Sequence, residues 1–267
     1  MKPGSEQFRS ILILTLINVG IIVILSFLSP TFLTYENLLS VLKRMSELGM
    51  LAIAETIVFI SGGFDLSIGT IMAISGLIAG QMYIFGLPFF LCVLLALLGG
   101  MAAGLMNALF IVKLRLQPFI VTLATMSILR SIVYGVLRGK TLSHFPESYL
   151  AYGDLTILGF PFLFLVLIVF AVLSSLLLQR TYIGRQIYAV GGNERSAYLS
   201  GISVNRIKYT VYILSGFICA CAGLLFSIRI RAIIPDAGLN SPLEVVTAVV
   251  IGGTAITGGK GTIAGSL

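Results

Sequence analysis

Two carboxylates stand inside long apolar stretches of this sequence, where an ionised side chain is costly. Glu55 lies within one apolar run, and Asp65 lies in a polar break at residues 61–70 that also carries three glycines. A central Asp costs about 2.5 to 3.5 kcal/mol on insertion scales, and non-helical backbone persists in a bilayer only where protein buries it or water reaches it. Asp65 therefore either caps the helix that starts near Leu66 or contacts a solute or a partner.

The sequence shows no motif for nucleotide binding, metal binding or catalysis. The stretch most similar to a phosphate-binding loop, residues 253–261, places Lys260 one position late and follows it with Gly rather than Ser or Thr. The three cysteines lie inside apolar runs without metal-ligand spacing, and the lone His144 lies in a polar loop and is assigned no role. With no nucleophile, metal set or acid–base pair, the sequence predicts no catalytic site, no metal and no cofactor bound by this chain.

Composition sets the fold class. The chain has 267 residues, of which 58% are hydrophobic and 10% charged, and its mean hydropathy is +1.07. Apolar stretches of about twenty residues recur along it, so we expect an all-α, polytopic transmembrane helix bundle that forms a single domain over residues 1–267. The net charge of +7 comes from basic residues at the ends of these stretches, which predicts orientation in a lipid membrane rather than binding of nucleic acid.

About eight apolar windows are visible, and some of them are expected to be broken or re-entrant. They cover residues 11–28, 45–60, 66–85, 89–112, 119–137, 160–178, 207–228 and 243–256. The first has no cleavage site and is interpreted as a retained span, with the N-terminus in the cytoplasm by the positive-inside rule. The pairs Gly76/Gly80 and Gly100/Gly104 have the spacing that lets membrane helices approach closely.

The connecting segment 179–205 has an amphipathic organisation of its own and is expected on the cytoplasmic side. Asn193 suits the N-cap, and Gly201 the C-terminal stop, of a short helix over about residues 194–200. Such a helix is typical of a knob that docks into a groove of a partner protein. The alternative is a loop stabilised by interfacial lipid.

Four motifs in chain order carry a family resemblance. They are GGFDLSIG at 62–69, QPFIVTLATM at 117–126, GRQIYAVGGN at 184–193, and AVVIGGT at 248–254 followed by GGKGT at 258–262. In this order, with matching hydrophobic spans, the chain resembles the permeases of ribose and other monosaccharide ATP-binding-cassette (ABC) importers over nearly its whole length. Members of that family continue past the last motif, so the chain looks truncated after residue 267, without the final helices.

The resemblance implies a fold like that of vitamin-B12-type (type II) importers. It implies a permease subunit that moves a ribose-like or other simple sugar inward across the bacterial cytoplasmic membrane. The implied partners are a second permease subunit in a homodimer or heterodimer, a cytoplasmic ABC subunit that binds ATP and Mg, and an extracytoplasmic sugar-binding protein. The residues alone leave an alternative open, an ion- or proton-coupled secondary carrier that uses Glu55 and Asp65.

Site residues follow from the same resemblance. It assigns coupling to the ATPase to Gly184, Arg185, Gly191, Gly192, Asn193, Glu194 and Gly201, and gating to Gly62, Gly63, Asp65, Gly69, Gly252 and Gly253. For the translocation path the sequence offers polar groups and one stacking face that suit a sugar, at Asn107, Gln117, Phe119, Thr122 and Thr125. The polar groups among them serve equally well as hydrogen bonds between helices, each contributing about 0.6 kcal/mol.

Two ion pairs complete the expectations. Glu47 can pair with Lys43 one turn earlier or with Arg44 on the same helix face. Glu55 has no such neighbour. Because Arg130 lies at comparable depth in a span that runs the opposite way, we predict that Glu55 and Arg130 pair and lock two helices together.

Overall fold

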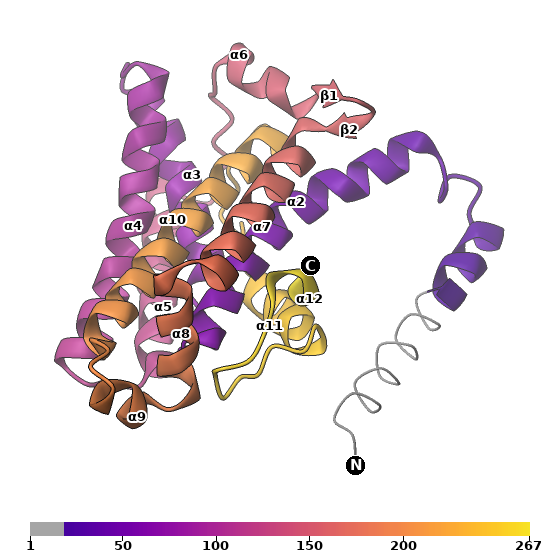
Figure 1. The fold of residues 1–267 in the computed structure, drawn as a ribbon. Coiled ribbons are helices and arrows are strands. Elements are labelled where there is room, and N and C mark those ends of the chain that lie inside the picture. The colour runs from indigo at the N-terminus through magenta and orange to yellow at the C-terminus, as the bar shows by residue number, and fades with distance from the viewer. Residues whose placement is uncertain (1–18) are drawn as a thin grey trace. The chain divides into compact units, whose positions relative to one another are not determined.

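A computed structural model describes residues 19–267 of the chain (Figure 1). The chain divides into two units, Met1–Leu42 and Lys43–Leu267, and helix α2 (Tyr35–Ile60) runs from the first into the second. The described part of the first unit also holds a helix over Val19–Leu28. The predicted span at 11–28 is therefore helical from residue 19 onward, and its earlier residues lie outside the described part.

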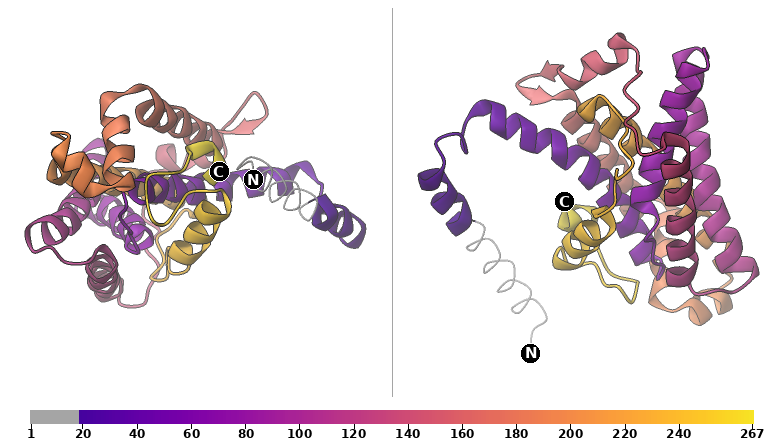
Figure 2. Two further views of the ribbon diagram at one scale, coloured as in Figure 1. Left: turned by 60° about the horizontal axis from the view of Figure 1, so that its bottom comes forward. Right: turned by 180° about the vertical axis from the view of Figure 1, so that it is seen from behind.

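The second unit is a bundle of helices with one small hairpin. The helices that follow α2 are α3 (Ile68–Ile84), α4 (Phe89–Lys113), α5 (Pro118–Leu137), α6 (Glu147–Leu150), the 3₁₀ turn η1 (Ala151–Gly153), α7 (Phe162–Arg180), α8 (Tyr182–Gly192), α9 (Glu194–Leu199), α10 (Val204–Ile230), α11 (Ser241–Ile251) and α12 (Ile263–Ser266). Strands β1 (Thr156–Ile157) and β2 (Phe160–Pro161) pair antiparallel. Helices α8 and α9 lie at one end of this unit and the hairpin lies at the other (Figures 1 and 2). The prediction of an all-α membrane bundle is confirmed.

Helix lengths separate full crossings from half crossings. Among the described residues, α4, α5, α7 and α10 are long and apolar enough to cross a membrane, whereas α3 and α11 are shorter apolar helices. With a rise of about 1.5 Å per residue, the 11 residues of α11 cover only about half of a hydrocarbon core roughly 30 Å thick. The predicted window 243–256 is therefore a half-helix, which is the re-entrant kind of segment expected from the sequence.

Helix α10 is the centre of the bundle. Burial covers 72% of its apolar window but only 22% of that of α7, whose outer face is exposed. Lipid supplies no hydrophobic drive between helices, so close packing depends on small residues at the contact. Three of the four predicted glycines serve this purpose: Gly104 packs against the carbonyl of Tyr212, Gly100 against Gly216, and Gly76 against Gly223. The fourth, Gly80, packs against the side chains of Leu142 and Phe145 instead of another helix.

Replacing Gly104 by Val is expected to destabilise the bundle, because the new side chain meets the backbone carbonyl of Tyr212 rather than a movable side chain. Over-packing of this kind costs about 1 to 3 kcal/mol. Gly135→Val is the matched control, since a side chain at Gly135 of α5 meets nothing within 4 Å. Thermal unfolding in detergent measures both variants, and equal midpoints would contradict the close packing of α4 on α10.

Candidate functional site

The polar break between α2 and α3 is held by side chains from other elements. The hydroxyl of Tyr212 on α10 donates to the carbonyl of Phe64 at 3.2 Å and accepts from its amide at 3.3 Å. The amide of Asp65 donates to Oε1 of Glu55 at 3.2 Å. Tyr212, Glu55 and Asp65 are almost fully buried, so water does not reach this backbone. The side-chain bonds therefore supply the partners that lipid cannot give to non-helical backbone.

Asp65 bonds to two serines, one just ahead of α3 and one on α10. Its Oδ1 accepts from the amide of Ser67 at 2.9 Å and from the Ser67 hydroxyl, and its Oδ2 lies 3.4 Å from the hydroxyl of Ser215 on α10. The carboxylate thus meets one amide ahead of a helix, but Asp65 is not the predicted cap: α3 begins at Ile68 instead of near Leu66, its N-cap residue is Ser67, and no side chain caps it. Contact of Asp65 with a solute or a partner stays a prediction.

The bonds around Asp65 continue into α4 and α5. Nδ2 of Asn107 donates to the Ser67 hydroxyl at 2.9 Å, and the Thr125 hydroxyl donates to Oδ1 of Asn107 at 2.6 Å. Asn107, Thr122 and Thr125 are all buried, and Thr122 donates to the carbonyl of Pro118 within its own helix. For Asn107 and Thr125 the structure supports the alternative that they join helices, whereas Thr122 bonds within α5.

Two of the proposed path residues remain exposed. Gln117 precedes α5 and is exposed, and Phe119 is 51% exposed. The ring of Phe119 lies 5.7 Å from that of Phe64, so it packs against the polar break from outside. A role for Gln117 and Phe119 in passage of a solute stays a prediction.

The predicted pair between Glu55 and Arg130 is wrong. Nη1 of Arg130 donates instead to the carbonyls of Pro235 and Ala237, at 2.9 and 2.8 Å, in the non-helical segment that follows α10. Oε2 of Glu55 has no hydrogen-bond partner among residues 19–267. Equal depth in the membrane, which the sequence gives, does not determine which sides of two helices face each other.

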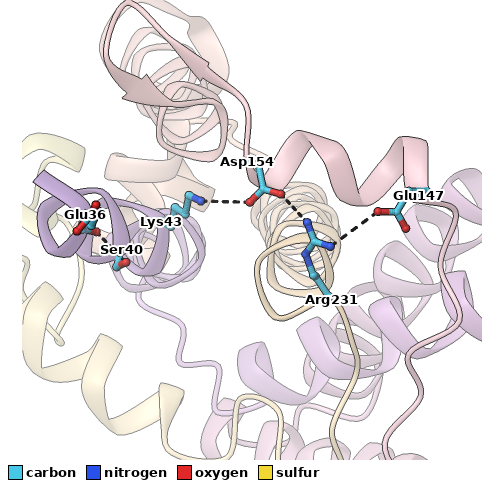
Figure 3. A network of polar contacts seen from close by, with 6 residues as sticks. All are labelled: Glu36, Ser40, Lys43, Glu147, Asp154 and Arg231. Carbon is cyan, nitrogen blue, oxygen red and sulfur yellow. Dashed lines mark hydrogen bonds and ion pairs between the residues drawn. The ribbon is translucent and has the colours of Figure 1, made fainter.

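Glu47 is neutralised by a distant arginine rather than by its helix neighbours. Arg229, near the end of α10, makes two bonds to the Glu47 carboxylate, at 2.6 and 2.9 Å. Lys43 points instead to Asp154, which also pairs with Arg231, and Glu147 lies on the other side of Arg231 (Figure 3). A tertiary contact thus replaces the local pair, because a bidentate arginine fits a carboxylate better than a lysine one turn away.

Helix α9 forms as the sequence predicts. The side chain of Asn193 accepts from the amide of Ser196 at 2.8 Å, and Gly201 ends the turn with φ +82°. Lys208 on α10 binds Glu194 at 2.8 and 2.9 Å and fixes the helix to the bundle. The free face of α9 exposes Leu199 and Tyr198, so the helix presents apolar side chains away from the protein.

Glycines from three distant motifs meet beneath the polar break. Gly191, at the end of α8, lies against Gly62, and a side chain added at Gly191 would meet the carbonyl of Ile60 and the amide of Gly259. The amide of Gly259 donates to the carbonyl of Ile60 at 2.9 Å. We call Gly62, Gly191, Gly258 and Gly259 the glycine junction; it joins the end of α2, the end of α8 and the loop after α11.

Tyr188 strengthens this junction. Its hydroxyl donates to the carbonyl of Gly261 at 2.7 Å. Burial raises the pKa of Tyr188, which keeps the hydroxyl protonated as a donor at neutral pH.

The remaining motif residues shape turns and close contacts. Gly69 packs against the backbone of Gly238, and Gly252 against that of Gly265. Gly63 lies beside the Tyr212 hydroxyl, and Gly253 turns the chain after α11 with φ +89°. A side chain added at Gly192 would meet nothing within 4 Å. In α8, there is no room for a side chain at Gly184, because the carbonyls of Leu177 and Leu178 are too close. The guanidinium of Arg185 lies 5.8 Å from the centre of the Tyr182 ring.

Sequence analysis missed Tyr212 and Ser215, which hold the break from α10. Both are polar, lie three residues apart on an apolar helix and therefore share a face, which is a usable signal. Among residues 19–267 no group of three or more His, Cys, Asp or Glu side chains could hold a metal ion. The site thus consists of hydrogen bonds and close backbone contacts.

Comparisons with known proteins place these features in context. Residues 37–267 match the family described as "Branched-chain amino acid transport system / permease component". The chain is 38% identical over 252 residues to the ribose import permease protein RbsC of Haemophilus influenzae, covering 92% of this chain and 78% of that protein. It is 34% identical to the fructose import permease protein FrcC of Rhizobium meliloti, covering 96% and 72%, and 33% identical to the L-arabinose ABC transporter permease protein AraH of Azospirillum brasilense, covering 91% and 72%. No solved structure matches the chain significantly.

The glycine junction predicts a sharp contrast between two neighbouring residues. Gly191→Ala is expected to push the end of α8 away from Ile60, because the new methyl group meets main-chain atoms. Gly192→Ala, with nothing within 4 Å, is the control. Hydrogen–deuterium exchange of residues 253–261 reports the bond from Gly259 to Ile60, and exchange that speeds up equally in both variants would contradict the junction.

Proposed function

The chain belongs to the family of branched-chain amino acid transport system permease components, and on that premise we propose that it is the membrane-spanning subunit of an ABC importer that carries a monosaccharide inward. The observation that carries this proposal is the similarity, over about nine tenths of the chain, to permeases named for ribose, fructose and arabinose import. The multi-pass helical bundle fits that assignment.

The proposal divides the work between this chain and its partners. The permease supplies the path, and a separate cytoplasmic ABC subunit binds ATP and Mg and hydrolyses the nucleotide. A second permease copy or homologue and an extracytoplasmic sugar-binding protein complete the importer. Nucleotide is assigned to the partner because the stretch at 253–261 departs from a phosphate-binding loop at Lys260 and Gly261.

Helix α9 is proposed as the contact with the ABC subunit, with the α9 end of the bundle in the cytoplasm. Its capped start, its tie from Glu194 to Lys208 and its exposed Leu199 suit a helix that lies in a partner's groove. The glycine junction connects this helix to the polar break, since the end of α8 directly precedes α9. Movement of α9 would then reach the helix ends around Asp65 as rigid-body displacement.

The ion-coupled carrier is the weaker candidate. Its one support is Glu55, whose buried Oε2 has no partner among the described residues. The carboxylate of Asp65, the other acid that the carrier requires, already accepts hydrogen bonds from Ser67 and Ser215. Uptake that follows an ion gradient and persists without ATP would favour the carrier.

Leu199→Glu is expected to abolish ATP-driven uptake without unfolding the permease. Leu199 is 76% exposed, so a charge there costs little in the free chain but would be unpaired in an apolar groove. Binding of the ABC subunit should weaken by roughly tenfold or more. The measurement is sugar uptake by proteoliposomes that hold the permease with the ABC subunit and binding protein encoded beside it, together with co-purification of the ABC subunit.

Leu114→Glu provides the control for that experiment. It adds the same charge at a 59% exposed position after α4, at the α9 end of the bundle but off that helix. Undiminished uptake by the Leu199 variant would refute α9 as the contact. Absence of ATP-dependent uptake in the unchanged complex would refute the importer itself.

A further inference from the structure

The chain re-enters the bundle after α10, along the side of α3. Ile233 pairs with Leu142 through two backbone bonds of 2.8 and 2.9 Å and packs against Gly76. Five residues later, Gly238 packs against Gly69 in the first turn of α3. The segment therefore descends along nearly two turns of α3, about 10 Å at 1.5 Å per residue, before the half-helix α11 begins (Figure 2).

Helix α5 holds this descending segment from within the bundle. Arg130 lies in the interior of the 20-residue α5 and binds the carbonyls of Pro235 and Ala237. One turn later, the Tyr134 hydroxyl donates to the carboxylate of Asp236. Non-helical backbone and charged groups at this depth are tolerated in a membrane protein where other parts of the protein bury them or where they line a water-filled cavity.

A polar cavity lies beside the segment. It has a volume of about 430 Å³, within the usual range of ligand pockets. Its charged and amide lining comes from α2, the end of α10, the descending segment and the start of α11, at Arg44, Glu47, Arg229, Asp236, Asn240 and Glu244. Three acids against two arginines leave the lining nearly balanced in charge, which suits a neutral polyhydroxylated solute better than an ion.

Arg44, Asn240 and Glu244 are the charged and amide groups of this lining that make no hydrogen bond among residues 19–267. Arg44 lies on α2, whereas Asn240 and Glu244 lie at the start of α11. Both are exposed, and their side chains make no hydrogen bond within residues 19–267, whereas Glu47 and Arg229 bind each other. They are spaced four apart at the start of α11, so they share one face of that half-helix. An exposed amide and an exposed carboxylate beside an apolar half-helix need water or a polar solute as their partner.

We propose that this cavity is a wall of the sugar path and that Asn240 and Glu244 contact the passing hydroxyl groups. The inference rests on the proposed function and adds to it the residues that meet the solute. It places the polar wall of the path at the start of α11, since Asn107 and Thr125 bond between helices and Thr122 bonds within α5.

Thiol labelling tests whether the cavity is wet. In the importer complex, Asn240→Cys is expected to react with a charged, membrane-impermeant methanethiosulfonate at least about tenfold faster than Val172→Cys, because a thiol facing lipid does not ionise. Val172 lies in the middle of α7 and is 52% exposed, so it matches Asn240 in exposure but not in surroundings. The unchanged chain, with its three native cysteines, gives the baseline. Equal rates at the two positions would overturn the proposal.

Transport tests whether sugar meets these side chains. Asn240→Ala and Glu244→Ala each remove one side chain that bonds a sugar hydroxyl. Each is expected to lower the D-ribose taken up per ATP hydrolysed by about fivefold, as for one lost hydrogen bond. ATP hydrolysis stimulated by the binding protein and the thermal midpoint are expected to stay at parental values. Uptake per ATP equal to that of the parent in both variants would overturn the assignment. A parent complex that takes up none of D-ribose, D-fructose and L-arabinose would instead refute the proposed function, and the labelling contrast would still decide whether the cavity holds water.

Discussion

The fold depends on satisfying backbone that is not helical at membrane depth. Between α2 and α3 the chain leaves the helical hydrogen-bond pattern for several residues, and lipid offers no substitute partners. Tyr212, Glu55 and Asp65 supply them from three directions, and Asn107 and Thr125 extend the same bonds to two further helices. The break is thus a cross-link between five helices, and the acids within it hold the bundle together.

A second requirement of the fold is that helix backbones pack in direct contact. Helices that gain nothing from hiding apolar surface in lipid must approach until their backbones touch, and α10 does so with α3 and α4 through glycine. The glycine junction uses the same contact outside the spanning helices, where the end of α8 lies on the last carbonyl of α2. Since main-chain atoms cannot swing aside, displacement of one of these segments carries the others with it.

Much of this architecture follows from local sequence. Hydropathy locates the long apolar helices, and the cap at Asn193 and the stop at Gly201 define α9, because both features depend on neighbours in the chain. The pairs of Glu47 with Arg229 and of Arg130 with two carbonyls could not be found in that way. Such contacts depend on the rotation of each helix about its axis, which an apolar window that is hydrophobic all round leaves undetermined. For the same reason the descent of residues 231–240 beside α3 was missed, although the shortness of α11 was foreseeable as a re-entrant element.

The glycine junction also constrains how this chain can evolve. The atoms that crowd Gly191 belong to the main chain of Ile60 and Gly259, so no exchange of a neighbouring side chain can make room for a larger residue there. The polar cavity is lined mostly by residues with long side chains, which mutation can resize, recharge or remove. The transported solute can therefore change during evolution of this fold, whereas position 191 in the glycine junction can hold only glycine.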